Sequence, residues 1–248
     1  MEPDNKYELM KIQNEEFDED GYFLASLLDP RKQCSMERGL KFDQLMMMYR
    51  CAIKEVRTKL EVLNEDLTAR YNRNPIEHIN SRIKEPVSIA KKLQKLGVEV
   101  CSESIPGNLN DVAGIRVICS FIDDIYTIAG MLIRQDDITL IKMKDYIENP
   151  KANGYRSLHL ILEVPVFFAD VTKMMRVEVQ IRTIAMDFWA SLDHHLRYKK
   201  DVKDAKLIEE ELRRCADVIS QTDEDMLRIR KRIFAGADSM ENHNLWKE

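Results

Sequence analysis

The sequence predicts a protein of the α/β class, in the α+β arrangement, with a mixed β-sheet of about four to five strands flanked by helices. Three observations carry this prediction. Apolar residues fall three and four apart in segments near both ends of the chain, which is the spacing of amphipathic helices. In the middle they alternate with polar residues at the strand period of two. The last three predicted strands also follow one another directly, an order that favours a mixed sheet with helices around it.

Five segments are predicted to be helical. Apolar residues from Leu45 to Leu67 have helical spacing, which predicts one long amphipathic helix over about 42–71. A second helix begins at Pro86, a residue favoured in a first turn, and stops at Gly97, a residue favoured just past a last turn. The remaining helices are expected at 123–135, 183–198 and 204–233.

Four segments alternate as strands, at 115–121, 138–144, 158–166 and 174–182. In the last of these strands the apolar residues take one face, so the polar residues must share the other. The polar residues are Arg176, Glu178, Gln180 and Arg182. For this strand taken alone, the solvated outer face of an antiparallel sheet is a sufficient explanation.

Two other strands carry a similar polar face. Arg116 points opposite to Ile115 and Val117, and Ser157 and His159 point opposite to their apolar neighbours. If the polar faces of the three strands coincide in the sheet, they form a site rather than a wet surface.

The turn before the strand at 158–166 adds a cation and an aromatic ring. Asn153-Gly154 is a strong turn dipeptide, with Lys151 before it and Tyr155 directly after it. The chain therefore turns and then enters the sheet with a dense group of polar side chains at the start of the strand.

Positive charge is concentrated locally in a chain that is acidic overall. With 43 acidic and 38 basic residues the formal charge is -5, so the chain as a whole is not suited to coat nucleic acid or an anionic membrane. Ser88, Lys92 and Lys95 recur at helical spacing and could hold an anionic ligand, although a solvated helix face explains the same pattern. The cations of this segment are Arg82, Lys84, Lys91, Lys92 and Lys95.

No run approaches the length of a membrane span, and the chain starts with acidic residues where a secretory signal would be basic and then apolar. We therefore expect a cytoplasmic protein without a membrane partner. The five cysteines are odd in number and widely spaced, which argues against a disulfide framework and against a structural zinc site.

Two carboxylates are candidates for a catalytic centre. Asp111 stands at the entry to a strand, and Glu178 lies at the centre of its strand's polar face, between two arginines. Carboxylates on neighbouring strands among cations are what a magnesium-polyphosphate site needs, because Mg²⁺ prefers hard oxygen ligands and the cations balance the remaining phosphate charge. The chain has no P-loop and no G-x-G-x-x-G motif, so ordinary kinase and dinucleotide folds are not expected.

Four segments, RIKEPVSIAKKLQK, DVAGIRVICSF, NGYRSLH and VEVQIRTIAMDFWASLDH, closely resemble in order and spacing the synthetase domain of the RelA/SpoT family. The match covers roughly residues 75–198, and with no hydrolase domain before it and no regulatory region after it the chain resembles the single-domain small alarmone synthetases. The resemblance implies a nucleotidyltransferase-like fold. It also implies Mg²⁺-dependent transfer of pyrophosphate from ATP to the ribose 3′-hydroxyl of GTP or GDP, which yields (p)ppGpp and AMP.

The resemblance also implies roles for individual residues. Asp111 and Glu178 would hold magnesium, and Glu178 would also take the proton of the attacking hydroxyl. The residues implied to bind ATP are Arg82 and Arg116 around adenine and Lys84, Ser88, Lys92 and Lys95 at the phosphates. The residues implied to bind GTP or GDP are Tyr155 stacked on guanine, Lys144, Lys151 and His159 near phosphate or ribose, and Gln180, Ala185 and Asp187 near the base.

The resulting domain plan places an acidic tail at 1–38, the synthetase domain with its long first helix at 39–200, and a helix and tail at 201–248. Family resemblance implies a homo-oligomer, a tetramer. Two other functions stay open: a toxin-like pyrophosphokinase that acts on the 3′ end of tRNA, which the acidic balance disfavours, and a catalytically silent regulator that binds a nucleotide or RNA.

Overall fold

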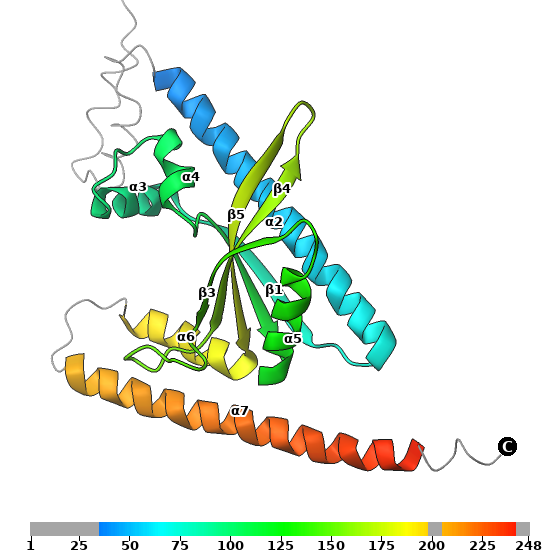
Figure 1. The fold of residues 1–248 in the computed structure, drawn as a ribbon. Coiled ribbons are helices and arrows are strands. Elements are labelled where there is room, and N and C mark those ends of the chain that lie inside the picture. The colour runs from blue at the N-terminus through cyan, green and yellow to red at the C-terminus, as the bar shows by residue number, and fades with distance from the viewer. Residues whose placement is uncertain (1–34, 198–204, 242–248) are drawn as a thin grey trace, which may run out of the picture. The chain divides into compact units, whose positions relative to one another are not determined.

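The computed structural model describes residues 35–197 and 205–241. The chain divides into two compact units, which are described separately. One comprises Met1–Met48, as far as it is described, and Lys84–Leu109; the other comprises Tyr49–Ile83 and Asn110–Glu248. The second and larger unit contains the whole β-sheet (Figure 1).

The sheet has five strands in the order β1-β2-β5-β4-β3. Strands β2 and β5 run parallel, and the other neighbouring pairs run antiparallel. This confirms the predicted mixed sheet of about four to five strands flanked by helices. The strands are β1 (Ile76–Ile83), β2 (Ala113–Cys119), β3 (Thr139–Asp145), β4 (Leu158–Phe167) and β5 (Thr172–Thr183).

Strand β1 was not predicted from the sequence. Its isoleucines, Ile76, Ile79 and Ile83, stand three and four residues apart, so they give no period-two signal. β1 is an edge strand that pairs only with β2, and most of its side chains are exposed. An edge strand with one paired neighbour needs less apolar alternation than a central strand, which explains why the pattern is weak.

The helices of the larger unit lie where the spacing of apolar residues predicts them, but the first begins at Ser35, seven residues before its predicted start at Phe42. Helix α2 contributes residues to both units, and α7 continues eight residues beyond the predicted end at Ile233, to Glu241. The helices are α2 (Ser35–Tyr71), α5 (Ile122–Ile133), α6 (Ile184–Arg197) and α7 (Ala205–Glu241).

Helix α7 runs past α6 at one end of the sheet (Figure 1) and is attached there by polar contacts. The indole N–H of Trp189 on α6 donates to the carbonyl oxygen of Leu212, at 2.9 Å. The Thr183 hydroxyl, at the end of β5, donates to the buried Asp223 carboxyl at 2.6 Å. These contacts join α7 to the strand that carries Glu178.

The core of the larger unit is formed by the apolar faces of the central strands and by the buried stripes of α2 and α5. Val177, Val179 and Ile181 of β5 are fully buried, as are Val56 and Leu60 of α2. Each such side chain stabilises the fold by about 1.5–3 kcal/mol. Because successive side chains alternate across a strand, burying these residues directs the polar residues between them to the opposite face.

The smaller unit contains α3 (Pro86–Lys95), the short 3₁₀ helix η1 (Ser102–Ser104) and α4 (Ile105–Asn108). Helix α3 buries Ile89, Ala90 and Leu93. It is followed by Gly97 at φ 70°, a conformation that glycine adopts readily just past a helix end, as the sequence predicts.

None of the described helices combines the length and the hydropathy of a membrane span. Cys119 is buried and Cys215 is exposed, and no disulfide joins cysteines within the described ranges. Most of the predicted acidic tail lies outside the described residues; only its last part falls within them, as the start of α2.

Candidate active site

The strand register brings the polar faces of the sheet together. A continuous row of polar residues crosses all five strands, because Arg116 pairs with Asn80 and Gln180, and Gln180 pairs with His159, which pairs with Lys144. The next position along β5, Glu178, is opposite Gly114. The polar faces of the three strands therefore coincide in the sheet, which is the condition under which the sequence favours a site over unrelated wet surfaces.

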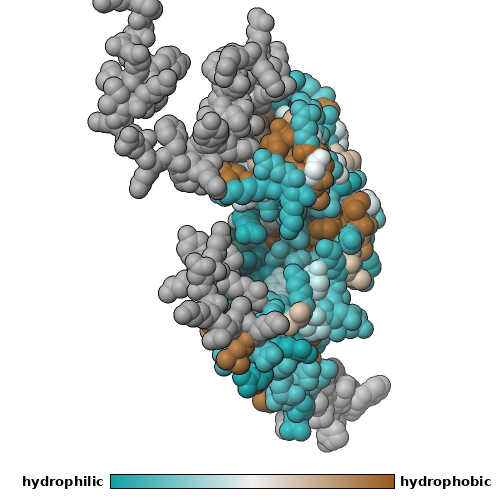
Figure 2. All heavy atoms as spheres, turned by 90° about the vertical axis from the view of Figure 1, so that its left-hand side faces the viewer, coloured by the Kyte–Doolittle hydropathy of each residue, from teal (hydrophilic) through white to brown (hydrophobic). Residues whose placement is uncertain are grey.

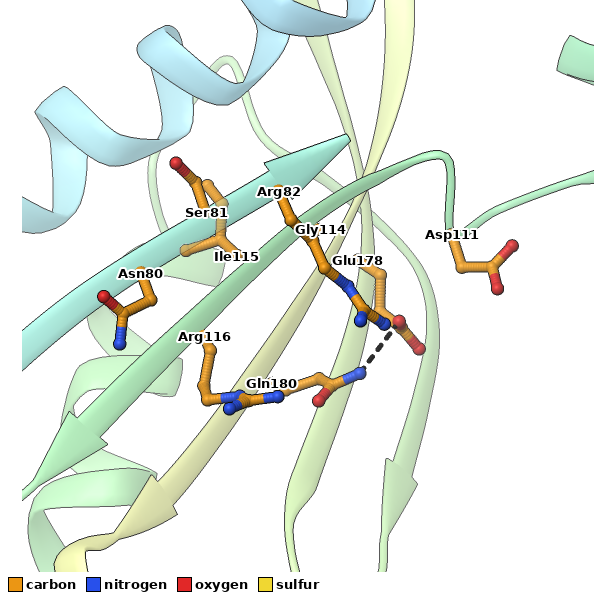
Figure 3. A pocket seen from close by; sticks show the side chains of 9 residues that line it. All are labelled: Asn80, Ser81, Arg82, Asp111, Gly114, Ile115, Arg116, Glu178 and Gln180. Atoms are coloured by element: carbon orange, nitrogen blue, oxygen red, sulfur yellow. Dashed lines mark hydrogen bonds between the residues drawn. The ribbon is translucent and has the colours of Figure 1, made fainter. Parts of the chain in front are cut away.

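A cavity of about 210 Å³ opens on this face, between β1, β2 and β5 (Figure 3). This is far more than the roughly 10–15 Å³ that such a cavity needs to hold one water molecule, so the cavity can admit a ligand group. Arg82 lies over Gly114, where the missing side chain leaves room for it. The residues that line the cavity are Asn80, Ser81, Arg82, Asp111, Gly114, Ile115, Arg116, Glu178 and Gln180.

Glu178 lies near the centre of the site and accepts hydrogen bonds from both of its neighbours. The His159 ring approaches through Nδ1 at 3.2 Å, and the Gln180 amide donates from Nε2 at 3.0 Å. Burial and the nearby charge of Asp111 act to raise the pKa of Glu178, but the hydrogen bonds and the His159 charge outweigh them. The pKa of Glu178 is therefore below its ordinary value, and the carboxylate is ionised at neutral pH.

Asp111 and Glu178 form a pair of carboxylates in one cavity, with Asp111 on the loop that leads into β2. No group of three or more metal-ligating side chains occurs among the residues that the structure describes. Two hard oxygen donors without a complete protein cage fit Mg²⁺, which keeps several waters and binds through one or two carboxylates together with substrate phosphates. The donor set therefore fits the magnesium ion that the sequence implies.

Tyr155, His159 and Arg182 extend the hydrogen bonds of Glu178. The Tyr155 hydroxyl lies 2.8 Å from His159 Nε2 and accepts from Arg182 Nη2 at 2.5 Å. The same nitrogen of Arg182 donates to Gln180 Oε1 at 2.8 Å. The five side chains thus form a closed circuit of hydrogen bonds. One path connects Arg182 with Glu178 through Tyr155 and His159, and the other connects them through Gln180.

The turn before β4 holds Tyr155 between charged and aromatic neighbours. The Lys151 ammonium lies 4.5 Å from the centroid of the Tyr155 ring and 4.7 Å from that of Tyr146. Tyr146 meets both the Tyr155 ring and the His159 ring edge to face. Lys151 and Tyr155, which the sequence places on either side of the Asn153-Gly154 turn, are therefore held together by a cation–π contact.

The turn is also fixed to α7. Gly154 adopts φ 87°, and a Cβ there would lie 2.6 Å from the Cβ of Ala216. Arg156 donates to the carbonyl oxygen of Ala216 at 3.1 Å and to the Asp217 carboxylate at 3.0 Å. Helix α7 therefore sets where the turn lies, and with it the place of Tyr155.

Asp187, in the first turn of α6, connects two arginines of the site. Its Oδ1 lies 3.3 Å from Arg116 Nη1 and 3.2 Å from Arg182 Nη1. Burial and then the charge of Arg182 lower the pKa of Arg116, and the Asp187 charge opposes them. The buried Nε of Arg116 has no hydrogen-bond acceptor within the described residues. Ala185 lies in the same first turn of α6 and is half-buried.

Four of the predicted ATP-binding residues belong to the smaller unit. Ser88, Lys92 and Lys95 lie on α3 away from its buried residues, and Lys84 precedes that helix. Ser88, Lys92 and Lys95 thus share one face of the helix, as their spacing predicts. Their role toward the ATP phosphates stays a prediction.

Two residues of the site were given no role from the sequence. Arg182 continues the alternation of Glu178 and Gln180, so the period of two places it on the polar face, but its many partners depend on how β4, β5 and α6 come together. Tyr146 carries no local signal, because its contact with Tyr155 depends on the path of the turn.

The sequence is similar to those of known proteins. The model of a "Region found in RelA / SpoT proteins" matches residues 81–203. GTP pyrophosphokinase YwaC of Bacillus subtilis is 42% identical over 188 residues, which cover 76% of this chain and 90% of that protein.

Two solved structures have a similar fold. Small alarmone synthetase 2 from Bacillus subtilis is 43% identical and superposes with a TM-score of 0.67, covering 75% of this chain and 97% of that one. Small alarmone synthetase 1 from Bacillus subtilis, bound to its product pppGpp, is 33% identical with a TM-score of 0.70, covering 77% and 97%. With such identity over nearly the whole length of these relatives, the chain belongs to the RelA/SpoT family, in its group of small alarmone synthetases.

Proposed function

We infer that the protein is a GTP diphosphokinase, which transfers pyrophosphate from ATP to the ribose 3′-hydroxyl of GTP or GDP and produces (p)ppGpp and AMP. The observation that carries this inference is the row of polar residues across the sheet, with Asp111 and Glu178 beside it. The curated relatives that share most of their length with this chain are GTP pyrophosphokinases, and one related structure holds pppGpp.

The reaction needs a proton acceptor at the attacking hydroxyl, and we assign this role to Glu178. The carboxylate takes the 3′-hydroxyl proton as the ribose oxygen forms a bond to the β-phosphorus of ATP. The bond between that phosphorus and the oxygen that bridges to the α-phosphorus breaks, and AMP leaves with the bonding electrons. The lowered pKa of Glu178 keeps the base ionised and ready to accept the proton at neutral pH.

We propose that Asp111 and Glu178 hold a magnesium ion. When bound, the ion would neutralise phosphate charge and polarise the phosphoryl oxygens. The lysines assigned to the ATP phosphates, Lys84, Lys92 and Lys95, would balance the charge that remains.

On the ATP side, we propose that Arg82 and Arg116 hold the adenine between their guanidinium planes. Both line the cavity, and a guanidinium stacks on a flat ring more readily than an ammonium does. Residues of the smaller unit would bind the ATP phosphates, because their charge and their spacing suit an anion. These residues are Lys84, Ser88, Lys92 and Lys95.

On the guanosine side, we propose that Tyr155 stacks on guanine, a contact worth about 1–3 kcal/mol. Stacking does not distinguish between bases, so specificity needs a hydrogen-bonding partner. A carboxylate such as Asp187 can accept from both the ring N–H and the amino group of guanine, which adenine cannot match. The other residues that we assign to this nucleotide are Gln180 and Ala185 near the base, and Lys144, Lys151 and His159 near the ribose or phosphates.

We further propose a homo-oligomer, a tetramer, that works in the cytoplasm, where ATP and GTP are available. Exposed apolar side chains on α6 support association: Ile184, Phe188 and Leu192 recur four residues apart and are 54%, 59% and 46% exposed. The face drawn in Figure 2 is mainly hydrophilic, with apolar residues in separate groups. We propose a synthetase domain at 39–200, between the segments 1–38 and 201–248.

The acceptor can be tested by incubating the chain with Mg²⁺, ATP and one candidate acceptor in each tube: GTP, GDP or tRNA. We expect a new guanosine species with GTP or GDP and none on tRNA, since the acidic chain is poorly suited to RNA. Transfer to tRNA alone would indicate a toxin-like pyrophosphokinase. If no acceptor reacts and no AMP forms, the site binds nucleotides without catalysis.

A further inference from the structure

Arg182 is the most buried cation of the site, with 4% of its surface exposed. Every nitrogen of its guanidinium donates a hydrogen bond. Nε donates to the Ser157 hydroxyl at 3.3 Å, Nη1 to Asp187 at 3.2 Å, and Nη2 to both Tyr155 and Gln180 at 2.5 and 2.8 Å. Burying a charge is costly unless it is paired and hydrogen-bonded, and these four contacts compensate the burial of the guanidinium.

Three of these partners are residues that we assign to the guanosine nucleotide, and they come from three elements. Tyr155 follows the turn before β4, Gln180 is on β5, and Asp187 is on α6. Arg182 therefore contacts both the aromatic ring proposed to stack on guanine and the carboxylate proposed to select it, while its own side chain is almost fully enclosed.

Hydrogen bonds also connect Arg182 with Glu178. An arginine can only donate and an ionised carboxylate can only accept, so the direction of the hydrogen bonds at both ends of the circuit is fixed. Tyr155 accepts from Arg182 and lies 2.8 Å from His159 Nε2, and Nδ1 of the same ring donates to the Glu178 carboxylate. On the other side, Gln180 accepts from Arg182 and donates to Glu178. Both oxygens of the carboxylate are thus oriented by paths that start at Arg182.

We propose that Arg182 is a positioning residue that shapes the guanosine-nucleotide subsite through Tyr155 and Asp187 and orients Glu178 through His159 and Gln180, without touching either substrate. This inference rests on the proposed function of the same site. A lysine could not replace the arginine. The guanidinium reaches its four partners from three nitrogens held in one rigid plane, whereas an ammonium has a single nitrogen.

The test compares Arg182→Lys with Arg73→Lys in the full chain. Arg73 makes a bidentate ion pair with the buried Asp124, on α5, and is not part of the site. Both variants keep the charge and lose a guanidinium that is paired with a buried or half-buried partner, so both should lower the midpoint of thermal unfolding. Only the first should change the guanosine subsite.

Calorimetric titration with GDP and with a non-hydrolysable ATP analogue then separates the two variants. We expect Arg182→Lys to weaken GDP binding by about tenfold or more and the ATP analogue by about twofold or less, whereas Arg73→Lys changes each by about twofold or less. Equal weakening of both ligands, unchanged GDP binding, or the same GDP loss in Arg73→Lys would overturn the proposal.

Tyr155→Phe provides an independent measurement if Arg182→Lys does not fold. It keeps the ring and removes the hydroxyl that connects Arg182 with His159. We expect GDP binding to weaken by about threefold or more and kcat at saturating nucleotides to fall; unchanged values for both would contradict the proposal. Alarmone formation by the unaltered chain is measured separately, so a failure of the proposed function is recognised independently of GDP binding.

Discussion

At the scale of single residues, Glu178 determines whether the site can perform catalysis. Replacing it by glutamine keeps the size and polarity of the side chain but removes the proton acceptor. We expect Glu178→Gln to lower kcat by about 10²–10⁴-fold, the usual contribution of a general base, while GDP binding stays measurable.

A matched control for this variant is Glu163→Gln, which makes the same chemical change on β4. Glu163 pairs with Arg176, outside the cavity. Assays of both variants at saturating ATP and GTP should show near-normal turnover for Glu163→Gln. Near-normal turnover for Glu178→Gln would exclude that residue from the mechanism.

Tyr155 should affect one nucleotide far more than the other. Loss of its ring in Tyr155→Ala removes a stacking contact worth about 1–3 kcal/mol, so the KM for GTP or GDP should rise by about 5–150-fold with little change in the KM for ATP. Tyr126→Ala removes a half-exposed tyrosine on α5, outside the site, and is the control. Equal changes in both KM values would argue against stacking on guanine.

The polar residues of this face could be predicted from the sequence, because the alternation along each strand decides which face a residue lies on. Alternation along one strand was enough to place Arg116, His159, Glu178 and Gln180 on polar faces, and the strand register then joined those faces. The central place of Arg182 could not be predicted in the same way. Its partners lie on separate elements, and their proximity is a property of the assembled fold.

At the scale of elements, the turn that carries Tyr155 depends on its contact with α7. Gly154→Ala would place a methyl group against Ala216 and would force an alanine into φ 87°. We expect the free energy of unfolding to fall by about 1–3 kcal/mol from the backbone strain, and the KM for GTP or GDP to rise because the turn moves. Denaturant unfolding and steady-state kinetics measure the two effects.

Gly97→Ala separates backbone strain from the steric clash. Gly97 has φ 70°, and a Cβ there would meet nothing within 4 Å. This variant should lose stability with little change in the KM for GTP or GDP. If Gly154→Ala affected that KM no more than Gly97→Ala does, α7 would not be what holds the turn in place.

The elements themselves could be predicted where periodicity was strong. Helix α2 and the central strands bury continuous apolar faces, so the period appears in the sequence, and α7 carries the same helical period although most of its apolar residues are exposed. Strand β1 could not be predicted because an edge strand with mostly exposed side chains needs no such period. The attachment of the turn to α7 joins residues about 60 positions apart, which no local pattern contains.

At the scale of the whole molecule, the attachment of α7 to the sheet should depend on pH. Burial raises the pKa of Asp223, and the Thr183 hydrogen bond only partly opposes it. A carboxyl group whose pKa is higher in the folded state than its unfolded value of 3.8 binds its proton more tightly when folded. Its contribution to stability is therefore complete below that pH and is lost as the pH rises through the folded pKa.

Asp223→Asn removes this titration and keeps an oxygen that can accept from Thr183. The variant should have a higher midpoint of thermal unfolding than the unaltered chain at neutral pH, and the difference should shrink as the pH falls toward 3.8. Thermal unfolding over a series of pH values measures it. A midpoint that is lowered equally at every pH would mean that the ionised carboxylate stabilises the fold.

We propose that the polar face of the sheet transfers pyrophosphate from ATP as a unit. The most direct test follows two labels from ATP, one on the α phosphate and one on the γ phosphate, in parallel reactions with GDP and Mg²⁺. We expect the γ label to enter a guanosine product and the α label to appear in AMP, in equal amounts. Formation of ADP with transfer of the γ phosphate alone, or no transfer of either label, would contradict it.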